Sequence, residues 1–426
     1  MSARIVPRSS IEQLALLALA VTSATYARSV VGPLQEAMRI DLSMSDDQVA
    51  VLQGIALAIP MAIGSIPLGL LVDRYSRARL FFLFTLLNVA ATVLTALAAD
   101  FWLLFVARLV VGVSMAGILI AVYSVVADLF TPQTRGRSAM ALAFGEIAGA
   151  PAAFALGGYL LTQVSSDSQA WRTALLWMTP PLLIVALLML ALQEPPRTGV
   201  VVRTPSLREV WPKLLRKRSL IAPLLLARIL VWVADGAVVI WAAPTLTRSF
   251  HLSAARVAGI IGGLFLVSGL LSPLLGGLLA DFCQRKGGPR LTMIALASLA
   301  LLSAPAALFG VTQDLTQTCV LLGAFLTLGY SLHLAALAVG TIVIPGELRG
   351  VYLAMTVTAA AVFGTGVAPL AVSTVSRCIG GAEKIGMALT LVCFCTSLVS
   401  AAIFALGSRH FPTTTTNLPV HEGQQA

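Results

Sequence analysis

The sequence has few charged residues for its length. Only 11% of its 426 residues are Asp, Glu, Lys or Arg, whereas a soluble domain has about 25%. Hydrophobic residues make up 58%, and the mean hydropathy is +0.92. A soluble globular protein is therefore excluded, because so little charge does not cover a water-exposed surface of this size.

Motifs for ATP hydrolysis, metal binding and nucleophilic catalysis are also missing. The sequence has no Gly-Lys-Ser/Thr phosphate-binding loop, which excludes an ATP-driven pump within this chain. No His, Cys, Asp and Glu residues have metal-ligand spacing, and there is no Gly-x-Ser-x-Gly turn. We predict that the protein is not an enzyme and has neither cofactor nor metal. The five cysteines lie mostly in or beside apolar segments and are predicted to be structural thiols.

The chain instead contains repeated runs of about 20 nearly uncharged residues, the length that spans a bilayer as a helix. The runs are continuously apolar rather than alternating, which disfavours β-strands. We predict an all-α membrane protein of twelve transmembrane helices, and we expect the first helix to be retained rather than cleaved as a signal peptide. The predicted parts are a six-helix bundle (1–193), a central loop (194–218), a second six-helix bundle (219–407) and a tail (408–426).

The formal charge of +10 reflects topology rather than a nucleic-acid partner. Most of the 28 Lys and Arg residues lie in the N-terminal segment, in alternate short links and in the central loop. By the positive-inside rule, both termini and the central loop are predicted to be cytoplasmic. We expect a multi-pass protein of a bacterial cytoplasmic (inner) membrane.

The two halves contain matching motifs. GLLVDRYSRAR begins at Gly69 and GLLADFCQRKGGPR at Gly277, while LFTPQTRGRSAMALAFGEIAGAP (129–151) matches VIPGELRGVYLAMTVTAAAVFGTGVAP (343–369). Such a duplication is typical of secondary transporters. The first motif resembles the loop 2–3 motif of the major facilitator superfamily, and Arg108-Leu-Val-Val-Gly112 resembles that family's fourth-helix motif. Within the family, the chain is similar to the spinster-like and organic-anion symporter branches.

The resemblance implies alternating access between two pseudo-symmetric bundles, with helices 1, 4, 7 and 10 lining a central cavity. Charges in the loop motif would hold one side closed; the competing explanation is that they only fix topology. Gly69 is expected to allow close helix approach. The gating residues predicted on this basis are Gly69, Asp73, Arg74, Arg77, Asp128, Arg135 and Asp281.

Ionisable residues inside the spans mark functional sites, because inserting each one costs roughly 2.5–3.5 kcal/mol. An arginine inside a span either binds an anionic substrate or donates its hydrogen bonds to backbone carbonyls. For Arg108, a role in helix packing is as compatible with the sequence as a role in substrate binding. Aromatic residues at depth are further candidates. The predicted substrate-binding residues are Arg28, Tyr26, Arg108, Arg228, Trp232 and Tyr330.

The candidate proton-coupling residues are Asp235, Glu146 and His333. Asp235 either titrates or forms a permanent ion pair with an arginine of another helix. Glu146 either titrates or pairs with Arg108 or Arg137. His333 is either a proton relay or a neutral histidine bonded to a helix carbonyl. The acids that the spinster-like branch carries are replaced by Ala27 and Met115, which leaves the coupling group open.

These observations predict a secondary active transporter, a symporter or antiporter, that moves a small organic anion with proton coupling. The anion is favoured because cavity arginines outnumber cavity acids. The alternative is a proton-driven exporter of drugs or lysophospholipid-like amphipaths. The expected partners are the small-molecule substrate, protons or a counter-ion and membrane lipids, and the expected assembly is a monomer.

Overall fold

The computed structural model describes residues 10–130, 135–164, 169–194 and 207–413, and within these ranges the chain is helical with no strand. Its contacts divide it into two compact units. The first unit comprises Met1–Val202 and Ile240–Leu266, and the second Arg203–Val239 and Val267–Ala426. The end of one long helix and the start of the next are thus grouped with the first unit. The bounds that we predicted for the two halves remain a prediction.

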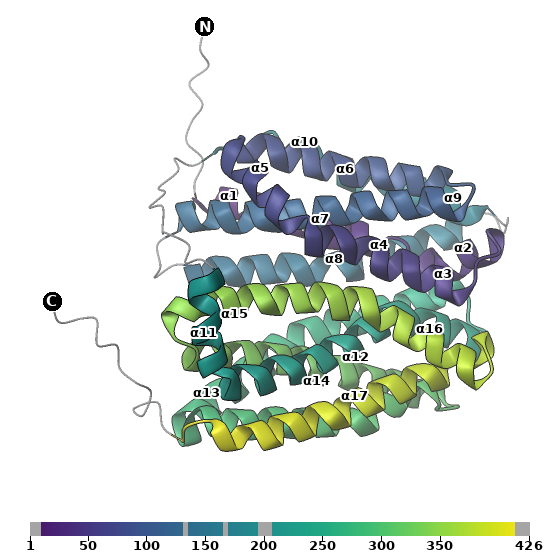
Figure 1. The fold of residues 1–426 in the computed structure, drawn as a ribbon. Coiled ribbons are helices and arrows are strands. Elements are labelled where there is room, and N and C mark those ends of the chain that lie inside the picture. Colours follow the sequence, from purple (N-terminus) through teal and green to yellow (C-terminus); the bar gives the residue numbers. More distant parts are fainter. Residues whose placement is uncertain (1–9, 131–134, 165–168, 195–206, 414–426) are drawn as a thin grey trace, which may run out of the picture. The chain divides into compact units, whose positions relative to one another are not determined.

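The first unit is built from ten helices and two short irregular helical segments, which Figure 1 colours from purple to blue. They are α1 (Ser10–Ser29), η1 (Gly32–Leu34), α2 (Gln35–Asp41), α3 (Asp46–Ala50), the π-helical η2 (Val51–Ile55), α4 (Ala56–Ile63), α5 (Ser65–Arg74), α6 (Arg77–Leu97), α7 (Phe101–Leu129), α8 (Arg135–Gln163), α9 (Ala170–Trp177) and α10 (Thr179–Met189).

The second unit contains the remaining elements, from teal to yellow in Figure 1. They are α11 (Leu207–Arg216), α12 (Arg218–Phe250), α13 (Ala254–Ala306), η3 (Ala307–Gly310), α14 (Leu315–Val343), α15 (Gly346–Ala359), the π-helical η4 (Ala360–Val367), α16 (Ala368–Ile379), η5 (Ala382–Lys384), α17 (Ile385–Gly407) and η6 (Ser408–His410). Helices α12 and α13 each continue into the first unit.

Among the described residues, eleven helical stretches are long and apolar enough to cross a membrane. The longest, Ala254–Gly310, has 57 residues, about twice the length of the others. It is interrupted at Gly287 and Gly288, whose backbone angles are not helical, and Gly288 has φ 60°, a conformation that glycine adopts most readily. This stretch therefore represents two spans, and the predicted all-α fold with twelve spans is confirmed.

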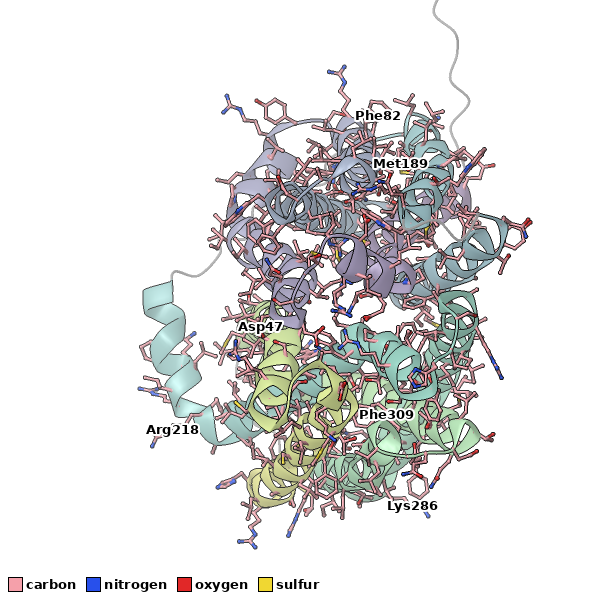
Figure 2. All side chains as sticks on the ribbon, turned by 90° about the vertical axis from the view of Figure 1, so that its right-hand side faces the viewer. Asp47, Phe82, Met189, Arg218, Lys286 and Phe309 are labelled. Atoms are coloured by element: carbon pink, nitrogen blue, oxygen red, sulfur yellow. The ribbon has the colours of Figure 1, made fainter. Side chains whose placement is uncertain are left out.

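Helix packing in the first unit depends on small residues and on one apolar core. Helices α6 and α7 lie side by side (Figure 1), and α1 packs along α8. A Cβ atom at Gly149 of α8 would lie 1.9 Å from Oγ1 of Thr25, so only glycine permits this approach of α8 to α1. Met189, labelled in Figure 2, is completely buried in the core that α1, α6, α7 and α10 share.

The second unit has its own core, formed by α12, α13, α14, α15 and α17. Phe309, labelled in Figure 2, packs edge-on against Phe325 with ring centroids 5.8 Å apart. On the other side of α12, a Cβ at Gly236 would collide with the carbonyl of Gly364 in the π-helical segment η4. The backbone of η4 therefore lies directly against the backbone of α12, next to Asp235.

Candidate functional site

An aspartate and a histidine of the second unit form a buried polar pair. Nε2 of His333 on α14 lies 2.8 Å from Oδ2 of Asp235 on α12. Asp235 is only 5% exposed, and neither its Oδ1 nor Nδ1 of His333 has a hydrogen-bond partner among the described residues. The pair can therefore take up a proton or a hydrogen-bonding ligand without breaking another contact. We predicted both residues as proton-coupling groups, and the structure brings them into direct contact.

Aromatic and cationic side chains extend this pair along α12. The Trp232 ring stacks on the His333 ring with centroids 5.2 Å apart. The guanidinium of Arg228 lies 4.5 Å from the Trp232 ring centroid and donates to the Tyr352 hydroxyl at 3.3 Å. Positions 228, 232 and 235 share one face of α12 because of their spacing. The predicted substrate residues Arg228 and Trp232 thus belong to one cluster with the Asp235–His333 pair.

Arg228 is bonded to protein groups rather than to an acid. It is 4% exposed, and no carboxylate of the described residues lies within ion-pair distance of it. Asp235 likewise pairs with a histidine and not with an arginine. Of the two alternatives that the sequence left open for Asp235, the permanent ion pair with an arginine of another helix is therefore not found among the described residues. Gly329 makes room for the carboxylate, since a Cβ there would lie 2.5 Å from Oδ1 of Asp235.

Arg108 in the first unit caps α1. Its Nη atoms donate to the carbonyls of Ala27 at 3.4 Å and Arg28 at 2.7 Å, and to Oε1 of Gln53 at 3.1 Å. These carbonyls belong to the last turn of α1, where no further helical amide is available to bond them. Of the two roles that the sequence left open, the structure therefore supports packing.

The other predicted polar residues of the first unit are Tyr26, Arg28 and Glu146. Tyr26 is 5% exposed and donates its hydroxyl to the carbonyl of Met178, 3.0 Å away. Arg28 is half-buried at the end of α1. Glu146 is not a partner of Arg108, whose side-chain hydrogen bonds go to Ala27, Arg28 and Gln53. The side chain of the other predicted partner, Arg137, lies outside the described residues. Tyr330 is half-buried on α14 beside Gly329.

The predicted gating loop is organised by Arg77, which is 2% exposed. Its Nη1 lies 2.5 Å from Oδ2 of Asp128 and donates to Ser124, and its Nε and backbone amide donate to Oε1 of Glu194 at 3.4 and 3.2 Å. Arg77 thus joins the start of α6 to the end of α7 and to the residues that follow α10. Sequence reasoning identified Arg77 and Asp128 but missed Glu194.

Electrostatics at this cluster favour ionised Glu194. Burial raises the pKa of Glu194, but hydrogen bonds from Ser76 and Arg77, together with the charge of Arg77, more than compensate and hold the pKa below its ordinary value. A depressed pKa means that ionisation stabilises the folded chain above the ordinary carboxyl pKa. This contribution is lost as the pH falls through the lowered value.

The remaining gating candidates do not share this environment. Asp73 and Arg74 are exposed at the end of α5, and Asp281 is exposed on α13. A Cβ at Gly69 would meet no described atom within 4 Å, so the close helix approach that we expected there is absent from this structure. Arg135 begins α8, but its side chain lies outside the described residues.

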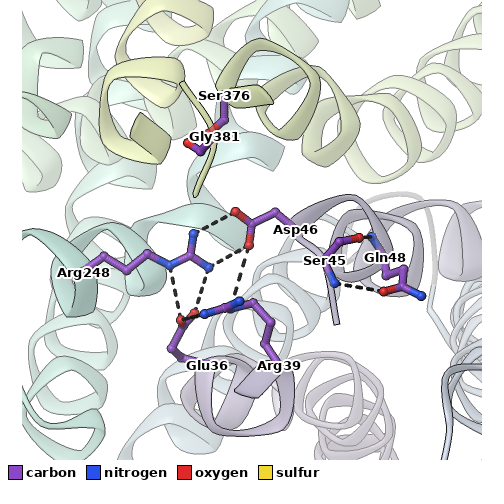
Figure 3. A network of polar contacts seen from close by, with 8 residues as sticks. All are labelled: Glu36, Arg39, Ser45, Asp46, Gln48, Arg248, Ser376 and Gly381. Atoms are coloured by element: carbon purple, nitrogen blue, oxygen red, sulfur yellow. Dashed lines mark hydrogen bonds and ion pairs between the residues drawn. The ribbon is translucent and has the colours of Figure 1, made fainter. Parts of the chain in front are cut away.

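A second charged network, which the sequence did not reveal, fixes the end of α12 (Figure 3). Arg248 lies 3.0 Å from Oε2 of Glu36 and 2.7 Å from Oδ1 of Asp46, and Arg39 pairs with Glu36 at 2.7 Å. Asp46 opens α3, whose start is fixed by a reciprocal capping interaction between Ser45 and Gln48. This Arg248 network has two acids and two arginines and is internally neutral.

Replacing Arg248 with Ala should loosen the last turns of α12, because Glu36 and Asp46 then lose their shared cation. We expect amide exchange of the α12 residues in the first unit, from Ile240 to Phe250, to accelerate about tenfold, which corresponds to ~1.4 kcal/mol. Hydrogen exchange with mass spectrometry measures this effect. Arg256→Ala, at an exposed arginine eight residues later, is the control. Equal acceleration in both variants would show that the network does not stabilise α12.

No group of three or more His, Cys, Asp or Glu residues in the described ranges is arranged to hold a metal ion.

Comparison with known families identifies the fold. A family model described as Major Facilitator Superfamily matches residues 17–369. The chain belongs to the major facilitator superfamily. The resemblance noted in its motifs is confirmed, and the protein is a multi-pass membrane transporter.

Individual members of the superfamily are similar over nearly the whole chain. An MFS-type efflux pump of Mycolicibacterium smegmatis is 28% identical over 418 residues, which cover 95% of this chain and 94% of the relative. Two solved structures share the fold: a bacterial homologue of the human lysosomal transporter Spinster in an inward-facing, unoccupied conformation (TM-score 0.79, 21% identity, 94% of this chain and 97% of that chain) and the nucleoside transporter NupG (0.72, 15%, 94% and 100%).

Proposed function

We propose that this major facilitator transporter is a proton-coupled exporter of cationic or zwitterionic amphipathic compounds. The Asp235–His333 pair is the observation that carries the proposal. Its carboxylate is buried, contacts a histidine ring, and retains one oxygen without a hydrogen-bond partner among the described residues. The similarity to an efflux pump supports export.

Protonation of the pair changes a buried charge. With Asp235 ionised and His333 neutral, the pair carries one negative charge, and uptake of one proton neutralises it. Because charge is costly between transmembrane helices, the unprotonated pair attracts a cationic headgroup and the protonated pair releases it. Proton and substrate then compete for the same carboxylate, and this competition couples their movements.

The arginines give less support to the organic anion that we favoured from the sequence. Arg108 is bonded to α1 carbonyls and Gln53, and Arg228 to Trp232 and Tyr352. Both are buried and bonded to protein groups, so neither presents its guanidinium to an organic anion of substrate size. An amphipath whose charged group is attracted to an acid is therefore the better-supported cargo.

We orient the chain with both termini in the cytoplasm, in a bacterial inner membrane, because most Lys and Arg residues lie in the corresponding links. Protons would then move inward along the electrochemical gradient while substrate moves outward.

Proton release in everted membrane vesicles tests this function. Adding a cationic amphipath to energised vesicles should dissipate the pH gradient when the wild-type chain is present. The response should be lost in His333→Ala but retained in His251→Ala, a control at the exposed histidine that follows α12. If organic anions produce the response, and if Arg28→Ala rather than His333→Ala abolishes it, the exporter proposal is wrong and the anion transporter is correct.

A further inference from the structure

A small cavity of about 20 Å³ lies within the first unit, bordered by residues of α2, α3, η2, α6 and α7. Its polar lining residues are Gln35, Gln53, Thr95 and Arg108, and its other lining residues are apolar. No acidic side chain contributes to the lining. The volume exceeds the ~10–15 Å³ that one water needs, so a water molecule or a small monatomic ion fits.

Two hydrogen-bond donors at the cavity have no acceptor among the described residues. Arg108 has only donors, so the atom of Gln53 that it contacts must be the carbonyl oxygen, Oε1. The amide nitrogen of Gln53 then donates to Oε1 of Gln35 at 2.9 Å. The orientation of both amides follows from the arginine and not from a choice between oxygen and nitrogen. It leaves Nε2 of Gln35 and Nε of Arg108 without an acceptor among the described residues.

The charge of Arg108 also has no counterion in the described structure. Arg108 is 2% exposed and has no carboxylate within ion-pair distance. The acids of α2 and α3 already have partners, since Glu36 and Asp46 bind Arg39 and Arg248, and Asp41 binds Arg172. A buried, uncompensated cation is costly, so an anion beside it is stabilising.

We propose that this cavity binds a small monovalent inorganic anion, chloride or another halide, between Nε of Arg108 and Nε2 of Gln35. The anion accepts the two unpaired hydrogen bonds and neutralises the guanidinium. It thereby holds Arg108 against the carbonyls of Ala27 and Arg28 and stabilises the end of α1. The proposal does not depend on the transported substrate or on the Asp235–His333 pair.

Thermal unfolding of the purified full chain tests the site. At constant ionic strength, replacing gluconate with chloride or bromide should raise the Tm of the wild type by about 2–4 °C at tenfold the dissociation constant. Gln35→Leu should abolish the increase. Asn88→Leu should retain it, because Asn88 is a fully buried amide of α6 that does not line the cavity.

A tethered carboxylate provides the second variant. Gln35→Glu should replace the bound anion, so its Tm in gluconate should match or exceed that of the wild type in chloride and should not respond to halide. Bromide-soaked crystals of the wild type should give an anomalous peak beside Arg108, which decides the matter should Gln35→Leu fail to fold. Equal wild-type Tm values in gluconate and chloride, with no bromide peak, would overturn the proposal and leave a water in the cavity.

Discussion

Asp235→Asn should abolish pH-gradient-driven transport while leaving exchange of substrate for substrate intact. The asparagine has the size of the aspartate and can still bond His333, but it neither binds a proton nor carries a negative charge. Proteoliposomes with an imposed pH gradient should therefore accumulate no more substrate than protein-free liposomes. Counterflow, which needs no net proton movement, should continue with a weaker apparent affinity for cationic substrates.

Two comparisons make this expectation specific. Glu383→Gln removes an acid that is exposed in η5 and should leave gradient-driven transport unchanged. Wild-type rates should decline with increasing pH on the side that supplies protons, and the Asp235→Asn rates should be independent of pH. Full gradient-driven accumulation by Asp235→Asn would mean that another group, with Glu146 as the first candidate, carries the proton.

The general fold was predictable because its signals are local in sequence. Span length, the scarcity of charge and the placement of Lys and Arg each depend on short windows. Asp235 and His333 could also be identified singly, as ionisable residues in apolar runs. Their contact could not, since 98 residues separate them and nothing in either segment specifies the helix pairing. The proximity of Arg228 and Trp232 was easier to predict, because their spacing along one helix places them on a common face.

The sequence was less informative where the role of a charged residue depends on neutral side chains or on partners far away in the sequence. Gln35 and Gln53 are neutral, so a charge pattern does not identify them, yet they determine which atoms of Arg108 have hydrogen-bond partners. Gln53 also lies in a π-helical segment, a local change of helical register that the apolar pattern does not predict. Arg248 and Glu194 lie outside the recognised motifs, and their partners are far away in sequence. Arg108 was therefore assigned to a possible substrate site although it caps α1.

Arg77→Ala should produce the largest loss of stability among the loop substitutions. Arg77 is buried and bonds groups on two other segments, so its removal leaves Asp128, Glu194 and Ser124 without their shared donor. We expect a loss of about 3 kcal/mol, the lower end for breaking a buried ion pair, because both carboxylates keep some exposure. The corresponding decrease in Tm is roughly 6–12 °C.

Arg79→Ala offers a matched control, since Arg79 is an exposed arginine two residues later in the same helix. Its Tm should stay close to that of the wild type. The wild-type Tm should fall as the pH drops through the lowered pKa of Glu194, and this portion of the pH dependence should disappear in Arg77→Ala, which no longer depresses that pKa. Equal Tm values for the two variants would show that the charges of this loop serve topology alone, because a purely topogenic arginine has no need of buried partners.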